Sequence, residues 1–231
     1  DRDAQNFIYK CKLLGKTIYS FGDFRQLLPI NNKKHFNSEN YINHLYKKVI
    51  DMQTNYRNNF TIEYYNSLIN SKSKIYLTNE VKKYRDTDYT KSDIIICITN
   101  EEKKIYNDLM CKYLKIKDIC TIGAKIICNS NDLRNKNIYN NFDFTIEKIE
   151  DDLITLDTGD KITQDELKKN FEFGYSITLF KAQGQEFNSF YIPDTSLEYL
   201  NSRSTYTIIS RLKQELSKET IKRNNTHTIK L

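Results

Sequence analysis

The pattern of apolar and polar positions alternates between short apolar runs and amphipathic stretches, as in a domain that mixes strands with helices. Ile94–Ile98 is apolar at every position, which is typical of a strand buried on both faces in a parallel sheet. Helical spacing follows directly, in Ile105, Leu109, Met110, Tyr113 and Leu114. A strand that leads into a helix is the βα unit of an α/β domain, so we predict an α/β fold around a parallel sheet with flanking helices.

The same reasoning predicts further elements on both sides of this unit. A strand is expected at Thr17–Phe21, a β-branched and aromatic run that ends abruptly at Gly22-Asp23. The spacing of one helix face is repeated by Phe60, Tyr64, Tyr65 and Leu68. Later apolar runs that we expect to form strands are Ala124–Cys128, Tyr175–Thr178 and Ser189–Ile192.

Between these later runs the pattern changes to short strands separated by polar turns. A polar loop, Asn129–Asn141, comes first. Three strands are then predicted, at Phe144–Ile149, Leu153–Leu156 and Lys161–Thr163. Acidic and Gly-containing turns separate them, which favours a small antiparallel, β-barrel-like insert over about residues 136–172.

Composition limits the class of protein. The 231 residues are 39% hydrophobic and 29% charged, which is enough apolar material for a core of ordinary size. No apolar run approaches the ~20 residues of a membrane span, so we predict no membrane partner. The chain starts with Asp1-Arg2-Asp3 and no initiator Met or signal peptide, so we expect it to begin in mid-protein.

The five cysteines form no Cys-x-x-Cys pair, and three of them, Cys97, Cys120 and Cys128, lie in apolar surroundings. We predict free thiols in a reducing compartment and no metal site. The net charge of +6 suits a nucleic-acid partner. Lys, Asn, Ile and Tyr dominate throughout, however, as an AT-rich coding sequence would produce, so charge alone does not decide the partner.

The string Gly22–Ile30, Gly-Asp-Phe-Arg-Gln-Leu-Leu-Pro-Ile, is the sharpest candidate for chemistry. An amide at the edge of a sheet can both donate and accept hydrogen bonds, so Gln26 is suited to contact a γ-phosphate or its attacking water. The alternative is a polar turn after a buried strand, and for the Gly-Asp-x-x-Gln residues alone this alternative is favoured.

Gly22–Ile30 resembles motif III of superfamily 1B helicases, the group of the Pif-type, Helitron and RecD-type enzymes. Other strings follow in the order of that family along nearly the whole chain. They are Asp51–Arg57 (motif IV), Ile94–Asn100 with Asn107, Gly123–Ile127, Gly174–Phe187 (motif V) and Tyr206–Arg211 (motif VI). Motif V is the most specific, and the common order and spacing support the resemblance more than any single string does.

The resemblance implies ATP hydrolysis, with Mg²⁺, at a cleft between two RecA-like domains. An arginine that contacts the negatively charged transferring phosphoryl group raises the rate by a factor of ~10³–10⁵. Arg57 and Arg211 match the two such arginines of the family; a surface arginine in a salt bridge is the alternative for each. Gln26 would act with them as a catalytic residue.

The remaining nucleotide-binding residues implied by the resemblance are Gly22, Asp23, Gly184 and Glu186. Glu186 matches a motif V acid that meets the ribose, and a carboxylate at a helix start is its alternative. On the DNA side, single strands lie in a groove that binds phosphates with polar and basic groups. Thr178, Lys181 and Gln183 of motif V would contact DNA, and Thr99 either contacts DNA, caps the next helix, or does both.

Gly15-Lys16-Thr17 resembles the end of a Walker A loop, but Lys10 stands where that loop needs a glycine. The loop also needs a helix after Thr17, whereas a strand is predicted there. We therefore interpret Gly15-Lys16 as a turn. No apolar strand ends in Asp-Glu either, so we expect both Walker motifs upstream of residue 1. Phe180 departs from the family, which usually has His at that position.

The predicted organisation is a C-terminal remnant of a first RecA-like domain, residues 1–46, followed by a second RecA-like domain, residues 47–231. The expected function is that of the C-terminal part of an ATP-dependent DNA helicase, inactive alone, which acts on single-stranded and forked DNA with the missing N-terminal domain. By analogy with the family, unwinding would run 5′→3′. The protein is expected inside the cell, in cytoplasm or nucleus. The composition suggests a viral or mobile-element source. The alternatives are a translocase without unwinding, and a non-catalytic DNA-binding fragment or remnant of a decayed gene.

Overall fold

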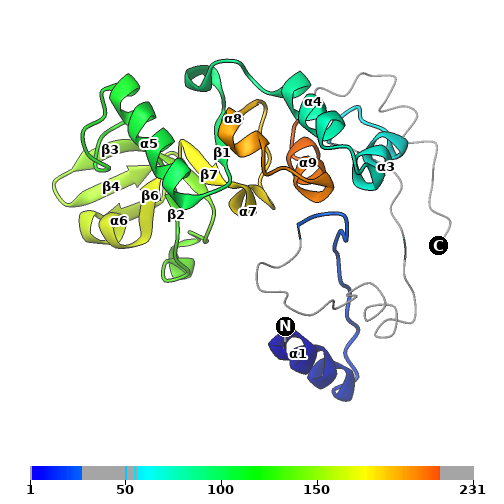
Figure 1. Cartoon of the computed structure of the whole chain (residues 1–231). Helices are drawn as coiled ribbons and strands as arrows, with labels where there is room; N and C mark the ends of the chain where they lie inside the picture. The colour runs from blue at the N-terminus through cyan, green and yellow to red at the C-terminus, as the bar shows by residue number, and fades with distance from the viewer. Residues whose placement is uncertain (1, 28–49, 51–54, 56, 214–231) are drawn as a thin grey trace.

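A small parallel sheet forms the centre of the chain (Figure 1). The computed structural model describes residues 2–27, 50, 55 and 57–213. Strand β1 (Ile94–Cys97) lies between β7 (Ser176–Thr178) and β8 (Phe190–Tyr191), and both neighbours run parallel to it. All four residues of β1 are buried, which confirms the strand predicted from the unbroken apolar run.

Helix α5 (Asn100–Leu114) follows β1 directly, as predicted, but it buries only part of the expected face. Asn107, Met110 and Cys111 are buried, whereas Ile105, Tyr113 and Leu114 are exposed. Asn107 is buried because Nδ2 donates to the Phe173 carbonyl (3.1 Å) and Oδ1 accepts from the Ser176 amide (2.9 Å). A polar residue bound to strand backbone thus sets the orientation of this helix, and the spacing of apolar residues could not predict it.

On the other side of the sheet, α3 (Ile62–Asn70) and α4 (Lys74–Tyr84) both pack against α9 (Ser202–Ile209). Tyr65 and Leu68 are buried in α3, which confirms that face. Two one-turn helices, α7 (Leu179–Ala182) and α8 (Asp194–Leu197), and the 3-10 turn η1 (Tyr89–Lys91) complete this part. One apolar core joins these helices to the parallel sheet.

The second sheet is antiparallel, with strand order β5-β4-β3-β2-β6. Its strands are β2 (Lys125–Cys128), β3 (Asp143–Glu150), β4 (Leu153–Leu156), β5 (Lys161–Thr163) and β6 (Phe171–Phe173). The turn η2 (Arg134–Lys136) precedes β3, and α6 (Gln164–Asn170) joins β5 to β6. The three predicted short strands are confirmed. This sheet has a core of its own and also contains β2, so it extends from 125 to 173, beyond the predicted insert.

The N-terminal segment contains a helix that the apolar spacing did not predict, α1 (Arg2–Leu13). It ends at Gly15, whose φ of +65° is left-handed, and the amides of Gly15 and Lys16 donate back to Lys12 and Cys11. Such a bond pattern is a helix C-terminal turn, which confirms that Gly15-Lys16 is a turn with no helix after it.

The strand predicted at Thr17–Phe21 is not formed among the described residues, where this run belongs to no sheet. Tyr19 and Phe21 are 81% and 84% exposed. A strand requires a neighbouring strand for its backbone hydrogen bonds, and no described residue pairs with this run. Local composition favours a strand here, but no described strand lies beside this run.

Cys97 and Cys128 are buried free thiols, as predicted, whereas Cys120 is only partly buried. Burial raises the pKa of Cys97 far above its usual value. Among the helices that the structure describes, each is too short or too polar to cross a bilayer.

Candidate functional site

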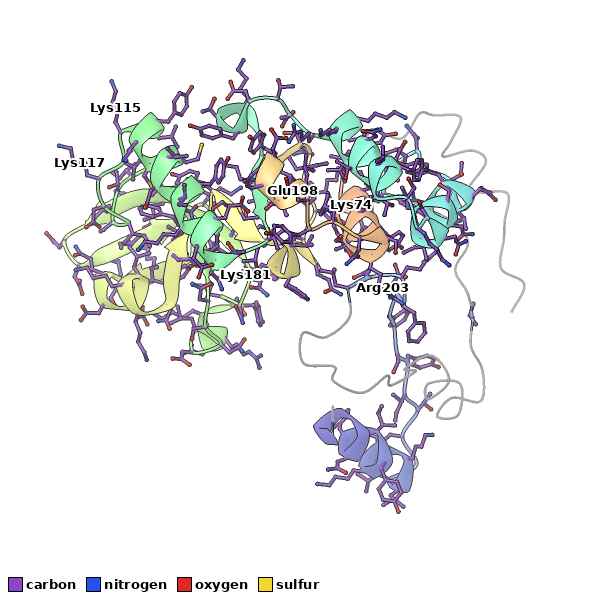
Figure 2. The ribbon with its side chains drawn as sticks, in the orientation of Figure 1. Lys74, Lys115, Lys117, Lys181, Glu198 and Arg203 are labelled. Atoms are coloured by element: carbon purple, nitrogen blue, oxygen red, sulfur yellow. The ribbon has the colours of Figure 1, made fainter. Side chains whose placement is uncertain are left out.

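The segment 22–27 packs against helix α9, which brings the predicted motif III and motif VI strings together. Tyr206 of α9 donates a hydrogen bond from its hydroxyl to Asp23 Oδ2. The guanidinium of Arg25 lies 5.3 Å from the centre of the Tyr206 ring. Arg203 donates to the backbone carbonyls of Phe24 and Gln26, the latter at 2.9 Å, and Figure 2 shows it where this segment meets α9. Residues 28–30 of the predicted motif lie outside the described residues.

Gln26 is held between Asp23 and motif V. Its Nε2 lies 3.4 Å from Asp23 Oδ2, and its Oε1 accepts a hydrogen bond of 3.0 Å from Gln183 Nε2. Burial alone would raise the pKa of Asp23, but hydrogen bonds from Tyr206 and Arg25 outweigh this and the pKa is lowered. The structure therefore joins a predicted nucleotide residue, Gln26, to a predicted DNA residue, Gln183, next to a charged carboxylate.

The two predicted arginines lie at the same place, beside the end of α9. Arg57 Nε donates to Glu186 Oε1 at 2.7 Å, and its Nη1 donates to the Ser210 carbonyl at 2.8 Å. Arg211 is only 8% exposed, and its Nε has no hydrogen-bond partner among the described residues. Burial lowers the pKa of Arg211, and the neighbouring charge of Arg57 lowers it further. Two adjacent guanidinium groups, one buried with an unused donor, suit an anion as their partner.

Arg57 is positioned by Asn55, which belongs to the predicted motif IV string, and the next residue in the loop is Asn58, which the sequence did not indicate. The amide of Arg57 donates to Asn55 Oδ1 at 3.0 Å. Asn58, which is buried, donates from Nδ2 to the Leu212 carbonyl at 2.8 Å and accepts from the Tyr65 hydroxyl at 2.9 Å. These bonds tie the loop before α3 to the residues after α9. Motif IV residues 51–54 and 56 lie outside the described residues.

Glu186 pairs with Arg57 and also lies 3.4 Å from Lys213 Nζ. The hydrogen bond from Arg57 is the main cause that lowers its pKa. Gly184, two residues earlier, has a φ of +100°, so the turn between α7 and Glu186 requires glycine. Gly22 lies in the extended segment, where open space surrounds it and the backbone does not require glycine.

The predicted DNA contacts Thr99 and Thr178 lie at the carboxyl ends of neighbouring parallel strands, because Thr178 is the last residue of β7, in register with Cys97, and Thr99 comes two residues after Cys97. Thr99 caps α5, because its Oγ1 accepts from the Glu102 amide at 3.1 Å. The capping role is thereby confirmed. Thr178 begins α7 without a capping bond from its side chain in the described structure. Ligands of open α/β sheets bind at such strand ends.

Lys181 lies between the antiparallel sheet and Arg203 in Figure 2. Its ammonium group already has hydrogen-bond partners within this chain. Its Nζ donates to Glu172 Oε1 at 2.8 Å and also to Asn129 Oδ1. Lys103 donates to the other oxygen of Glu172 at 2.7 Å. Neither Glu172 nor Asn129 could be predicted as a partner of Lys181, because both come from parts of the chain without a matched motif.

The fold is similar to solved structures of Pif1 helicases over most of the chain. Bacteroides Pif1 in complex with ADP-AlF3 and single-stranded DNA aligns with a TM-score of 0.58 at 16% identity, covering 87% of this chain and 61% of that one. Bacteroides Pif1 bound to single-stranded DNA gives 0.59 at 16% identity, with the same coverage. A structure of two coordinating Pif1 helicases at forked double-stranded DNA gives 0.57 at 18% identity, covering 87% and 59%.

The chain spans about three fifths of the length of these structures. No family model and no curated protein matches it. At this identity the likeness establishes the fold: a three-stranded parallel sheet flanked by helices, with an antiparallel sheet, arranged as in part of a Pif1 helicase.

Proposed function

We propose that this chain is the C-terminal part of an ATP-dependent DNA helicase, which couples ATP hydrolysis to movement along single-stranded DNA and to unwinding of forked duplex. One observation carries the proposal. Arg57 and Arg211, from two separate motifs, meet beside the end of α9, and Arg211 keeps a buried donor without a partner among the described residues. The Gln26 segment packs on the same helix.

On the nucleotide side, the two arginines would meet the oxygens of a transferring phosphoryl group, which concentrates negative charge. Glu186 binds Nε of Arg57 and the Ser210 carbonyl binds its Nη1, and together they fix the direction of the guanidinium. The amide of Gln26, held by Asp23, would contact the terminal phosphate or the attacking water. Mg²⁺ would be bound by residues upstream of this chain and would neutralise phosphate charge.

On the DNA side, Thr99, Thr178 and Lys181 would bind phosphates along the ends of β1 and β7. Gln183 is exposed and also bonds to Gln26. This bond supports a coupling role, because a shift of Gln183 on DNA binding would move the Gln26 amide. Fold likeness to structures that hold ADP-AlF3 and single-stranded DNA supports the same assignment.

The test uses the complete protein that contains this chain. It should hydrolyse ATP only with Mg²⁺, faster with single-stranded DNA, and unwind a forked duplex with a 5′ tail in preference to a 3′ tail. Residues 1–231 alone should not hydrolyse ATP. DNA-stimulated hydrolysis without unwinding would favour a translocase, and DNA binding without hydrolysis would favour a non-catalytic protein.

A further inference from the structure

Lys181, the basic residue of the proposed DNA side, shares its carboxylate partner with a second lysine. Glu172 of β6 accepts from Lys181 of α7 at 2.8 Å and from Lys103 of α5 at 2.7 Å. The three residues therefore join both sheets at one point. Their charges sum to +1, so Glu172 neutralises only part of the positive charge that a phosphate would meet here.

The two lysines differ in their exposure to solvent. The side chain of Lys103 is 12% exposed and that of Lys181 is 25% exposed. Burial alone would raise the pKa of Glu172, but the hydrogen bonds from both lysines outweigh it, so the pKa is lowered and the carboxylate stays charged. The more buried Lys103 can keep Glu172 bound while the more exposed Lys181 turns outward.

We propose that Glu172 competes with DNA phosphate for Lys181. It thereby weakens the binding of single-stranded DNA and speeds its release. This inference rests on the proposed function. Glu172 is a positioning residue, since it acts through the Lys181 ammonium. A motor that steps along a strand must release each phosphate, and an internal carboxylate lowers the net gain from each contact. Lys103 anchors the carboxylate so that it is retained beside Lys181 when the phosphate takes its place.

The test measures binding of residues 1–231 to a labelled oligothymidine by fluorescence anisotropy at two salt concentrations. Glu172→Gln should bind about three- to tenfold more tightly than the unchanged chain, with a salt slope steeper by ~0.7 because one more phosphate is neutralised. In a Lys181→Ala background the same change should have less than about twofold effect, since coupled residues are not additive.

The matched control is Glu150→Gln, which makes the same change of charge at an exposed pair, where Glu150 lies 2.7 Å from Lys148. It should alter affinity by less than about twofold if diffuse charge contributes little. Glu172→Asp provides a second variant that keeps the net charge and shortens the reach to Lys181. It should also tighten binding, and thermal unfolding should show that each variant folds.

The outcomes separate the two proposals. If Lys181→Ala weakens binding but neither Glu172 variant tightens it, competition by Glu172 is overturned and the DNA side is kept. Equal tightening by Glu150→Gln and Glu172→Gln would also overturn it, in favour of diffuse charge. If Lys181→Ala leaves affinity unchanged, the DNA side itself is wrong and the inference is overturned with it.

Discussion

The proposed nucleotide side and the proposed DNA side of the candidate site hold their cations in opposite ways. Arg211 is buried and keeps a donor without a partner in the described structure, whereas Lys181 is more exposed and already paired. A guanidinium stays charged at any ordinary pH and presents a planar set of donors, so it suits one fixed anion geometry. An ammonium on a flexible stem exchanges partners readily. The contrast fits a nucleotide side organised for one transition state and a DNA side organised for repeated release.

The largest expected effect is on the nucleotide side. In the complete protein, Arg211→Ala and Arg57→Ala should each lower kcat for ATP by ~10³ or more, because each removes a cation from the phosphoryl oxygens. Affinity for single-stranded DNA should change little, as measured by anisotropy beside a steady-state ATPase assay. Arg134→Ala is the control, since Arg134 lies outside this site and bonds to Asn131. Loss of DNA binding with intact hydrolysis would reverse the assignment of the two sides.

The next largest effect is expected when the hydrogen bond between Tyr206 and Asp23, beside the contact of Gln26 with Gln183, is removed. Tyr206→Phe removes the hydroxyl that donates to Asp23 but keeps the ring that Arg25 covers. A hydrogen bond to a charged group contributes about 1.5–3 kcal/mol, so DNA-stimulated hydrolysis should fall roughly tenfold or more as Asp23 and Gln26 lose their position. Tyr199→Phe, at a tyrosine that is 68% exposed, provides the control in the same ATPase assay. Equal rates for both variants would show that Tyr206 does not position Asp23.

A smaller effect is expected on the DNA side. Lys181→Glu should weaken oligothymidine binding by roughly tenfold at low salt and reduce the salt slope by ~0.7. Lys117→Glu makes the same charge reversal at an exposed lysine after the C-terminal end of α5, far from Lys181 in Figure 2. It should change affinity by less than about twofold. Equal losses from the two reversals would mean that binding is diffuse charge and that motif V makes no DNA contact.

The smallest effect concerns the turn that leads to Glu186. Gly184→Ala places a side chain at a φ of +100°, which should lower the free energy of unfolding by about 1–2 kcal/mol. Gly22→Ala is the matched control, because open space surrounds Gly22 and its φ lies outside the left-handed region. Urea denaturation measures both. If Gly184→Ala unfolds at the same urea concentration as the unchanged chain, the turn does not require glycine in solution.

The sequence by itself determined the elements whose signal is local. The continuous apolar run of β1, the three short strands of the antiparallel sheet and the Thr99 cap all depend on residues close together in the chain, and the structure confirms each of them. Backbone hydrogen bonding and side-chain alternation impose these patterns on a short stretch directly. The motif strings likewise indicated which residues belong together, although their roles toward nucleotide and DNA stay predictions.

Tertiary structure alone decided which groups meet. The hydrogen bonds of Asn107 to strand backbone leave Ile105 and Leu114 of α5 exposed. The run at Thr17–Phe21 forms no strand, because no described strand lies beside it. Arg57 binds Glu186, which lies 129 positions away in the sequence. Lys181 of α7 binds Glu172, which lies on a strand of the antiparallel sheet. Such pairs depend on how separate elements pack and which charges they bring within hydrogen-bonding distance, and no local pattern of side chains contains that information.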